Sequence, residues 1–338
     1  MPSKVDVNAW RGVWVFVEQY KGKPARVSFE LLGKGRELAD KLSVPLTALV
    51  LGENVGKLAE DAVASGADRV LLADAPKLSE YTTELYAKII AEAALREKPE
   101  ILLVGASPVG RDLAPTLSYR LSGGCTADCT SLDVDLDKRL LVSTRPAFGG
   151  NVMATIICPD HRPQMSTVRP GVMPLPEPDP ARKGEIVKLP VDLSSVTPKV
   201  RVLESRLRES EGGNICEAEK VVGIGMGAGS KAGFDAIREL AKLLDAEVAG
   251  TRPAVEAGWI SHDCQVGQTG KTIRPSLYVA CGISGTVQHT AGMSGAKTIV
   301  AINKDPNADI FKFADYGIVG DAAKIVPKII ERLKSEKG

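Results

Sequence analysis

Short apolar runs alternate with amphipathic stretches through the first third of this chain, and this alternation constrains the fold more than any other feature. Predicted strands lie at residues 13–17, 46–51, 69–72 and 101–104, and each is rich in Val, Leu or Ile. Residues 31–42, 55–64 and 85–95 have the apolar spacing of helices. Strands that alternate with helices of this length are typical of βαβ units on a parallel sheet. The pattern therefore predicts an α/β fold.

A second α/β series begins near residue 221. It predicts strands at 221–225, 247–249, 277–280, 298–302 and 317–319, with helices at 232–244 and 322–333. Between the two series lie strand-like pieces at 140–143 and 152–157, which we expect to complete the first domain. A stretch at 174–180 has four prolines in seven residues and cannot form helix or central strand.

The 338 residues exceed what one hydrophobic core usually organises. The segment 208–214 is polar and rich in glycine, so we place the domain boundary near residue 207. The predicted domains are 1–207 and 208–338, each a mostly parallel sheet with flanking helices, the second doubly wound.

Composition argues against several classes of protein. The 43 basic and 42 acidic residues give a net charge of +1, and aromatic residues are only 4%, which disfavours binding to nucleic acid or an anionic membrane. No apolar run approaches the ~20 residues of a membrane span, and the polar start is unlike a secretory signal. We expect a cytoplasmic protein that does not insert into membranes.

The cysteines indicate no metal site. Cys125 and Cys129 form the only close pair, and a zinc or iron–sulfur site would need further ligands at recognisable spacing. We interpret them as buried structural thiols.

Glycine-bearing or polar turns follow several strands of the second series. They are 223–229, 282–289, 303–305 and 320–321. Each could be an ordinary connection, but turns at the carboxyl ends of parallel strands meet at one edge of the sheet. Together they predict one extended ligand site of the kind that a dinucleotide needs.

The irregular stretch 251–270 is rich in amides and hydroxyls, which suits hydrogen bonds to a neutral heteroaromatic edge. Arg252 beside it could face a negative ring or a phosphate. His289 is one of three histidines, with His161 and His262, and for His289 a structural and a functional interpretation stay open. No Ser-His-acid, Cys-His or HExxH arrangement accompanies these turns, so we expect no catalytic residue.

The run Leu-Tyr-Val-Ala-Cys-Gly-Ile-Ser-Gly-Thr-Val-Gln-His-Thr-Ala-Gly at 277–292, followed by Thr-Ile-Val-Ala-Ile-Asn at 298–303, resembles the signature of the electron-transfer flavoprotein alpha subunit. The resemblance extends over 265–270, 303–306 and 314–321, and more loosely over the first domain. It implies a heterodimer with a beta subunit and FAD held by the C-terminal domain. The first domain would then be a docking scaffold for the beta subunit without a cofactor of its own.

The activity that the resemblance implies is electron transfer between dehydrogenases, such as an acyl-CoA dehydrogenase, and a downstream acceptor. It leaves open whether the complex also bifurcates electrons between NADH and ferredoxin. An NAD-dependent oxidoreductase is an alternative, although no general acid or base lies beside the glycine turns. A non-catalytic adenylate-binding module is a second alternative, which the absence of visible flavin absorbance would favour.

The resemblance also assigns residues to the cofactor. Redox tuning falls to Arg252, Thr269 and His289. Thr251 and Arg252 would lie near the isoalloxazine, and Asn303 and Asp321 would bind the adenosine half. The full set of expected contacts is Thr251, Arg252, Gln265, Val266, Gly267, Gln268, Thr269, Ser284, Gly285, Thr286, Val287, Gln288, His289, Asn303 and Asp321.

The chain departs from the family pattern at Met226, where relatives often have an arginine near the FAD diphosphate. The departure puts phosphate binding there in doubt. Lys231 is near in sequence and is our candidate for a compensating charge.

Overall fold

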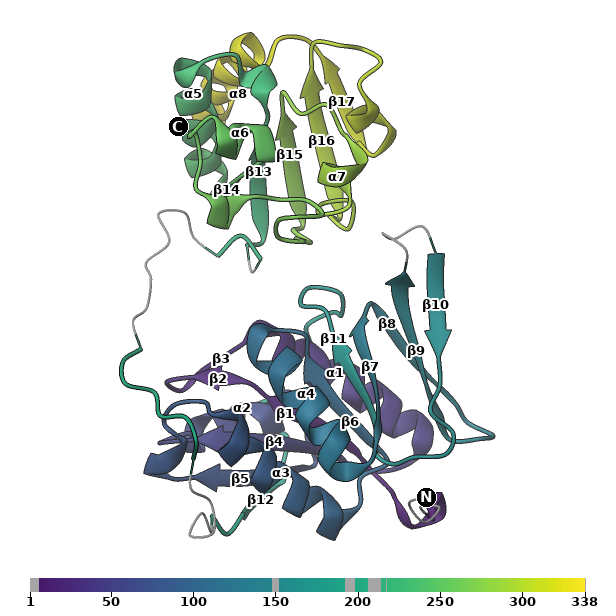
Figure 1. The fold of residues 1–338 in the computed structure, drawn as a ribbon. Coiled ribbons are helices and arrows are strands. Elements are labelled where there is room, and N and C mark those ends of the chain that lie inside the picture. The colour runs from purple at the N-terminus through teal and green to yellow at the C-terminus, as the bar shows by residue number, and fades with distance from the viewer. Residues whose placement is uncertain (1–5, 148–151, 192–197, 206–213, 217, 338) are drawn as a thin grey trace. The chain divides into compact units, whose positions relative to one another are not determined.

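The computed structural model describes residues 6–147, 152–191, 198–205, 214–216 and 218–337. The chain divides into two compact units, Met1–Ser205 and Arg206–Gly338 (Figure 1). The boundary expected near residue 207 and most of the segment 208–214 lie outside the described residues.

Unit 1 is built on a seven-stranded sheet in the order β12-β5-β4-β1-β6-β11-β7, and all its pairs are parallel. The central strand β1 (Val13–Val17) is buried along its whole length. This burial on both faces explains its continuous apolar run. The other strands are β4 (Leu46–Gly52), β5 (Arg69–Asp74), β6 (Ile101–Gly105), β7 (Gly124–Cys129), β11 (Gln164–Val168) and β12 (Glu185–Lys188).

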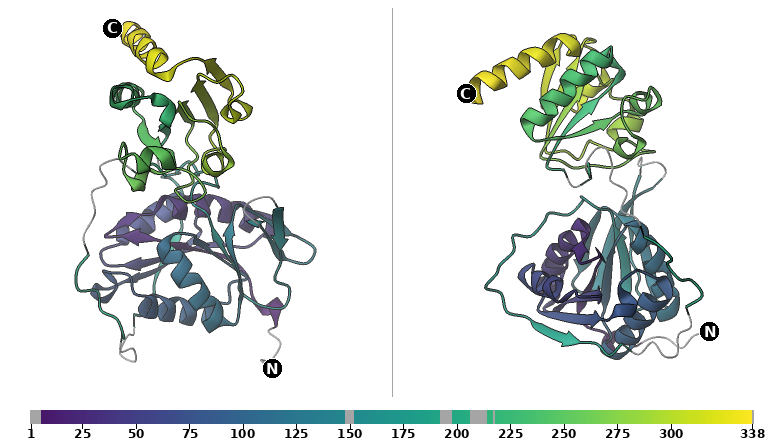
Figure 2. Two further views of the ribbon diagram at one scale, coloured as in Figure 1. Left: turned by 45° about the horizontal axis from the view of Figure 1, so that its top comes forward. Right: turned by 90° about the vertical axis from the view of Figure 1, so that its left-hand side faces the viewer.

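Helices cover both faces of this sheet (Figure 2). On one face α1 (Arg26–Leu42) and α2 (Gly56–Ala64) pack on Val13, Val15 and Val50. On the other, α3 (Thr83–Glu97) and α4 (Pro108–Leu121) pack on Trp14 and Phe16. The predicted strands and helices of this part are therefore confirmed, although α1 begins earlier than its apolar spacing suggested.

A separate antiparallel sheet, β10-β9-β8, follows β7 in the chain. Its strands are β8 (Ser131–Asp135), β9 (Leu140–Ala147) and β10 (Val152–Ile156). The expected strands at 140–143 and 152–157 exist, but they pair with each other rather than extending the parallel sheet. Residues 174–180 contain no helix or strand, as their prolines predicted.

Short elements complete unit 1. They are the two-stranded pair β2 (Gln19–Tyr20) and β3 (Lys23–Pro24) and the 3-10 helices η1 (Val7–Ala9) and η2 (Pro76–Leu78). No helix in the described part of the chain is long and apolar enough to cross a membrane.

Unit 2 contains a five-stranded parallel sheet in the order β14-β13-β15-β16-β17. Its strands are β13 (Lys220–Ile224), β14 (Glu247–Gly250), β15 (Leu277–Cys281), β16 (Thr298–Asn303) and β17 (Tyr316–Val319). After β13 the chain moves to one side of that strand and then returns to add β15 on its other side. The carboxyl ends of β13 and β15 therefore form the topological switch point where open α/β sheets bind ligands.

The two faces of the unit 2 sheet are covered differently. The long helices α5 (Lys231–Leu244) and α8 (Ala322–Lys337) pack together on one face (Figure 1). The other face carries irregular chain with short helices: α6 (Arg252–Glu256), α7 (Val287–Thr290), η5 (His262–Cys264) and η6 (Asp309–Lys312). The 3-10 helix η4 (Met226–Ala228) lies between β13 and α5. The structure confirms the predicted α/β fold class. The long helices of unit 2 cover one face of its sheet, and the short helices cover the other.

Candidate functional site

A cavity of about 650 Å³ opens at the carboxyl ends of β13, β15 and β16. Its volume lies within the range of small-molecule and cofactor sites, roughly 300–1,000 Å³. The turns that follow these three neighbouring strands all contribute to its wall. The predicted site residues that line it are Thr251, Arg252, Gln265, Val266, Gly267, Thr269, Ser284, Thr286, Gln288, His289 and Asn303.

Four predicted contacts are not among the described residues that line this cavity: Gln268, Gly285, Val287 and Asp321. Gln268 donates its backbone N–H to the Gln288 carbonyl at 2.6 Å, and Val287 is 71% exposed. Asp321 accepts the backbone N–H of Ala323 at 3.0 Å, at the start of α8.

Gly285 has a structural reason to be glycine. Its φ is +86°, and a Cβ there would lie 2.1 Å from the Ile310 nitrogen. It therefore lets the turn after β15 pack against η6.

The glycine turns after β13 and β15 pack directly against each other. The N–H of Gly227 donates to the Gly282 carbonyl at 2.9 Å, and a Cβ on Gly225 would lie 2.2 Å from that same oxygen. The spaced glycines are therefore required by the close approach of two backbones. One N–H in the first turn of α5 is satisfied from within the chain, because Ser230 Oγ accepts the Gly233 N–H at 3.3 Å.

The loop Gln265–Gly270 forms one wall of the cavity. Gln265 is only 3% exposed, and its Nε2 donates to Thr269 Oγ1 at 3.1 Å. Because a hydroxyl has one proton and two lone pairs, Thr269 can accept this bond and still donate its own proton. Thr269 is exposed, so that proton is available to a ligand.

His289 is buried against the same loop. Its Nδ1 lies 3.1 Å from the Val266 carbonyl oxygen and its Nε2 lies 2.9 Å from the Tyr278 hydroxyl. Burial lowers the pKa of His289 to about 4, because desolvation disfavours the charged ring. The imidazole is therefore neutral at pH 7, and both ring nitrogens are engaged within the protein.

The side chains of Arg252 and Asn303 also make hydrogen bonds within the protein. Arg252 is the first residue of α6, is exposed, and donates from Nε to Glu256 at 2.8 Å. Asn303 donates from Nδ2 to the Ile283 carbonyl at 2.8 Å and accepts the Asp305 N–H at 2.9 Å. Its side chain holds the turns after β15 and β16 together.

The segment after β16 adds lining residues that the sequence reasoning missed. They are Asn307, Ala308 and Asp309, next to Lys304 and Asp305 in the turn already singled out. The backbone bond from Ile310 N to Ser284 O, at 3.0 Å, brings η6 to the cavity. No strand or helix periodicity marks this segment, and only its Asn and Asp content suggested turns.

Two side chains of the cavity bear on position 226, where this chain has methionine and relatives often have arginine. Met226 lines the cavity and is 48% exposed, so a longer side chain could be accommodated there. Lys304 lines the same cavity and is exposed. The side chain of Lys231 lies outside the described part of the structure.

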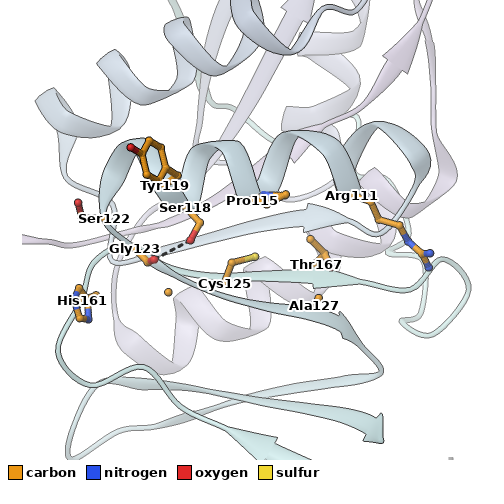
Figure 3. Close-up of a pocket in the computed structure, with 11 residues that line it drawn as sticks. Arg111, Pro115, Ser118, Tyr119, Ser122, Gly123, Cys125, Ala127, His161 and Thr167 are labelled. Carbon is orange, nitrogen blue, oxygen red and sulfur yellow. Dashed lines mark hydrogen bonds between the residues drawn. The ribbon is translucent and has the colours of Figure 1, made fainter. Parts of the chain in front are cut away.

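Unit 1 has a separate cavity of about 920 Å³ beside α4 and the edge strand β7 (Figure 3). Ser118, on its wall, donates to the Gly123 carbonyl at 2.8 Å, and burial raises the pKa of Cys125 to about 11. Its lining residues are Arg111, Pro115, Ser118, Tyr119, Ser122, Gly123, Gly124, Cys125, Ala127, His161 and Thr167.

Cys125 and Cys129 contribute to different apolar clusters. Cys129 is fully buried in the cluster beneath α1 and α2, whereas Cys125 is only partly buried and packs on the cluster of α3 and α4. The expectation of buried thiols therefore holds for Cys129 but not for Cys125. Across the residues that the structure describes, no group of three or more His, Cys, Asp and Glu side chains is placed to hold a metal.

Comparison with known proteins assigns the chain to a family. Residues 13–194 match the profile of the electron transfer flavoprotein domain, and residues 214–294 match that of the electron transfer flavoprotein FAD-binding domain. The chain belongs to the electron transfer flavoprotein family. Its cofactor is FAD, held by the unit that contains the cavity described above.

Full-length relatives place it among the alpha subunits. The electron transfer flavoprotein subunit alpha of Thermoanaerobacterium thermosaccharolyticum is 52% identical over 98% of this chain and all of that protein. Protein FixB of Clostridium saccharobutylicum is 51% identical over 98% of both chains. The acryloyl-CoA reductase electron transfer subunit beta of Anaerotignum propionicum is 43% identical over 99% of both. Electron transfer flavoprotein alpha subunits form heterodimers with beta subunits.

The chemistry of the cavity fits FAD. Its wall carries neutral donors and acceptors suited to the edges of heteroaromatic rings: the side chains of Thr251, Thr269, Ser284, Thr286 and Gln288. Lys304 adds a cation that can pair with an anionic diphosphate, and Arg252 adds a second that can face a negative ring. The carboxylates of Asp305 and Asp309 also line the cavity.

Proposed function

We propose that this chain is the FAD-carrying subunit of a heterodimeric electron carrier that relays electrons between dehydrogenases and a downstream acceptor. One observation supports the proposal most strongly. Cofactor residues assigned from separate stretches of sequence, around 251, 265–269, 284–289 and 303, line one cavity at the switch point of the unit 2 sheet. The relative named for acryloyl-CoA reductase supports an acyl-CoA oxidoreductase as donor or acceptor.

Bound FAD supplies the one- and two-electron redox chemistry, and the chain's own residues bind it and set its environment. We assign Thr251 and Arg252 to the isoalloxazine, and residues 265–269 to its ring edge. Ser284 to His289 approach the pyrimidine side and ribityl chain, and Asn303 and Asp321 serve the adenosine half. Within this set, Thr269 is the clearest donor, since its hydroxyl accepts from Gln265 and keeps its own proton.

Unit 1 is, in this proposal, the scaffold on which the beta subunit docks. We place the complex in the cytoplasm. Six cysteines dispersed through 338 residues support that location, because such a distribution is unlike the dense disulfide frameworks of small secreted domains.

The proposal is tested by producing the chain with its beta subunit and recording the absorption spectrum, followed by stepwise reduction with an acyl-CoA dehydrogenase and its substrate. Flavin bands that bleach on addition of dehydrogenase and substrate support it. A colourless complex that binds NAD or AMP overturns it. Reduction by NADH through a second FAD in the beta subunit would assign the complex to the bifurcating class.

A variant pair tests the assignment of the ring-edge loop. Thr269→Val removes the donor, and Thr269→Ser keeps it. A neutral hydrogen bond of about 0.5–1.5 kcal/mol corresponds to roughly 20–65 mV for one electron. We expect the potential of bound FAD to fall by this amount in Thr269→Val and to stay near that of the unmodified chain in Thr269→Ser. Equal potentials in all three proteins would contradict the assignment.

A further inference from the structure

Tyr278, the second residue of β15, has a fully buried polar side chain. It is 0% exposed, and its hydroxyl oxygen lies 2.9 Å from His289 Nε2. The neighbouring strand makes room for it, because a Cβ on Gly223 of β13 would lie 2.0 Å from that oxygen. Desolvation raises the pKa of Tyr278, so the phenol keeps its proton.

The contacts of His289 fix where its own proton lies. The Val266 carbonyl can only accept, so Nδ1, at 3.1 Å, must carry the hydrogen. In a neutral ring Nε2 then has a lone pair, and the Tyr278 O–H is the donor that fills it. The order of donation is Tyr278 to His289 to Val266.

This chain of bonds joins three separate segments: β15, α7 and the loop Gln265–Gly270. A backbone bond from Gln268 N to Gln288 O, at 2.6 Å, ties the same loop to α7. Gly267, between the two ties, has φ +143°, and a Cβ there would lie 2.5 Å from the Gln288 oxygen. The backbone of the loop therefore packs directly against the backbone of α7.

We propose that Tyr278 is a positioning residue for the FAD site, which holds His289 in the neutral form with its proton on Nδ1 and thereby fixes the Val266 carbonyl and the loop that presents Gln265 and Thr269. This inference rests on the proposed function, because it requires that the loop contacts FAD. His289 then acts through the loop. It brings neither a charge nor a free N–H to the cofactor, so the direct tuning role expected for it becomes an indirect one.

The first test reads the ring directly and does not depend on activity. The chain has three histidines, so 15N-histidine labelling of this chain alone, followed by assembly with an unlabelled beta subunit, gives three ring systems. His161→Gln and His262→Gln assign two of them. At pH 7 we expect His289 to show the neutral pattern with hydrogen on Nδ1, both with FAD and after its removal. A ring that is charged, or carries its hydrogen on Nε2, overturns the proposal.

The second test removes only the phenol oxygen. In Tyr278→Phe the lone pair on Nε2 loses its donor, while the Val266 carbonyl still requires the hydrogen on Nδ1. We therefore expect the Nε2 resonance of His289 to shift towards that of an imidazole nitrogen without a hydrogen bond. FAD should dissociate about tenfold more readily, because a buried partner is left unpaired. Tyr316→Phe is the matched control, since Tyr316 is 66% exposed on β17.

The outcomes separate this inference from the proposed function. If the heterodimer holds no FAD but shows the Nδ1–H ring in the unmodified chain and the shift of the Nε2 resonance in Tyr278→Phe, the proposed function fails and the positioning bond stands. If FAD binds normally and Tyr278→Phe leaves both the ring pattern and the FAD dissociation constant unchanged, Tyr278 has no positioning role.

Discussion

The buried imidazole of His289 makes the stability of unit 2 depend on pH. Its pKa is lowered from 6.5 to about 4 by burial, so the unfolded chain binds a proton more readily than the folded one. Above pH 6.5 the ring is neutral in both states and does not favour unfolding. As the pH falls from 6.5 towards 4, only the unfolded chain takes up the proton, so the free energy of unfolding decreases. Acidification should therefore favour unfolding of this unit.

The size of the effect follows from the two pKa values. Between pH 7 and pH 5, the unfolded histidine becomes almost fully charged while the folded ring stays mostly neutral. Linkage then predicts a loss of about 2 kcal/mol in the free energy of unfolding from this one group. His289 is only 5% exposed, so solvent screens the effect little.

The assay compares the heterodimer with its His289→Gln variant, which has no titrating ring. Urea unfolding is measured at pH 7 and pH 5, and a hydrogen-exchange pulse at one fixed pH is read on peptides from residues 277–292. Other groups that titrate in this range, such as carboxylates of the cavity wall, cancel in the difference between the two proteins. His262→Gln is the control, since His262 is exposed.

We expect the unmodified chain and His262→Gln to lose about 2 kcal/mol more than His289→Gln between the two pH values. An equal loss in all three proteins would refute the reasoning, because it would mean that His289 has an ordinary pKa in the folded state.

Three further predictions follow from particular contacts. Arg139→Met should destabilise unit 1 by about 1–3 kcal/mol, because the 1% exposed Glu100 carboxylate keeps the Gly12 N–H at 3.2 Å but loses the guanidinium that now binds it at 2.7 Å. Urea unfolding checks this against Lys57→Met, whose ion pairs are exposed. Gly282→Ala should abolish FAD binding, since its Cβ would lie 2.4 Å from the Gly227 carbonyl carbon, whereas Gly229→Ala, at a similar positive φ but in open space, should bind FAD normally in a spectroscopic titration. Met226→Arg should lower the FAD dissociation constant about tenfold by adding a charge-assisted bond to the diphosphate, and Met226→Leu should leave it unchanged by the same titration.

The sequence could predict the central strands because burial on both faces requires a continuous apolar run. Residues 13–17 and 46–51 are examples, and both strands are completely buried. It could not predict that the strands near 140 and 152 form their own antiparallel sheet, since a short apolar run does not specify its partner. Helix α4 escaped notice because it contains Pro115 and begins with a proline, although Ser107 before it is a regular N-cap.

The site could be predicted in part for a related reason. Parallel strands end at one edge, so the turns after β13, β15 and β16 had to meet, whatever the details of their sequence. The glycines of those turns were harder to interpret. Gly227 and Gly282 look like phosphate-binding residues in sequence, yet the structure shows that each allows the other's backbone to approach. Sequence spacing records that a side chain is excluded, but not which neighbour excludes it.

These contacts suggest why the cavity wall holds few charges. A carrier that accepts and releases electrons works best when its surroundings do not have to rearrange at each step, and fixed dipoles meet this need. The glycine turns after β13 and β15 are held together, Asn303 joins the turn after β15 to the turn after β16, and the neutral His289 ties the ring-edge loop to α7. Burial lowers the pKa of His289 to about 4, so the ring that ties this loop is neutral at pH 7. The charged side chains of the lining, Arg252, Lys304, Asp305 and Asp309, are all exposed, where water screens them. We therefore expect the fixed neutral donors to contribute more to the potential of the cofactor than these charges do.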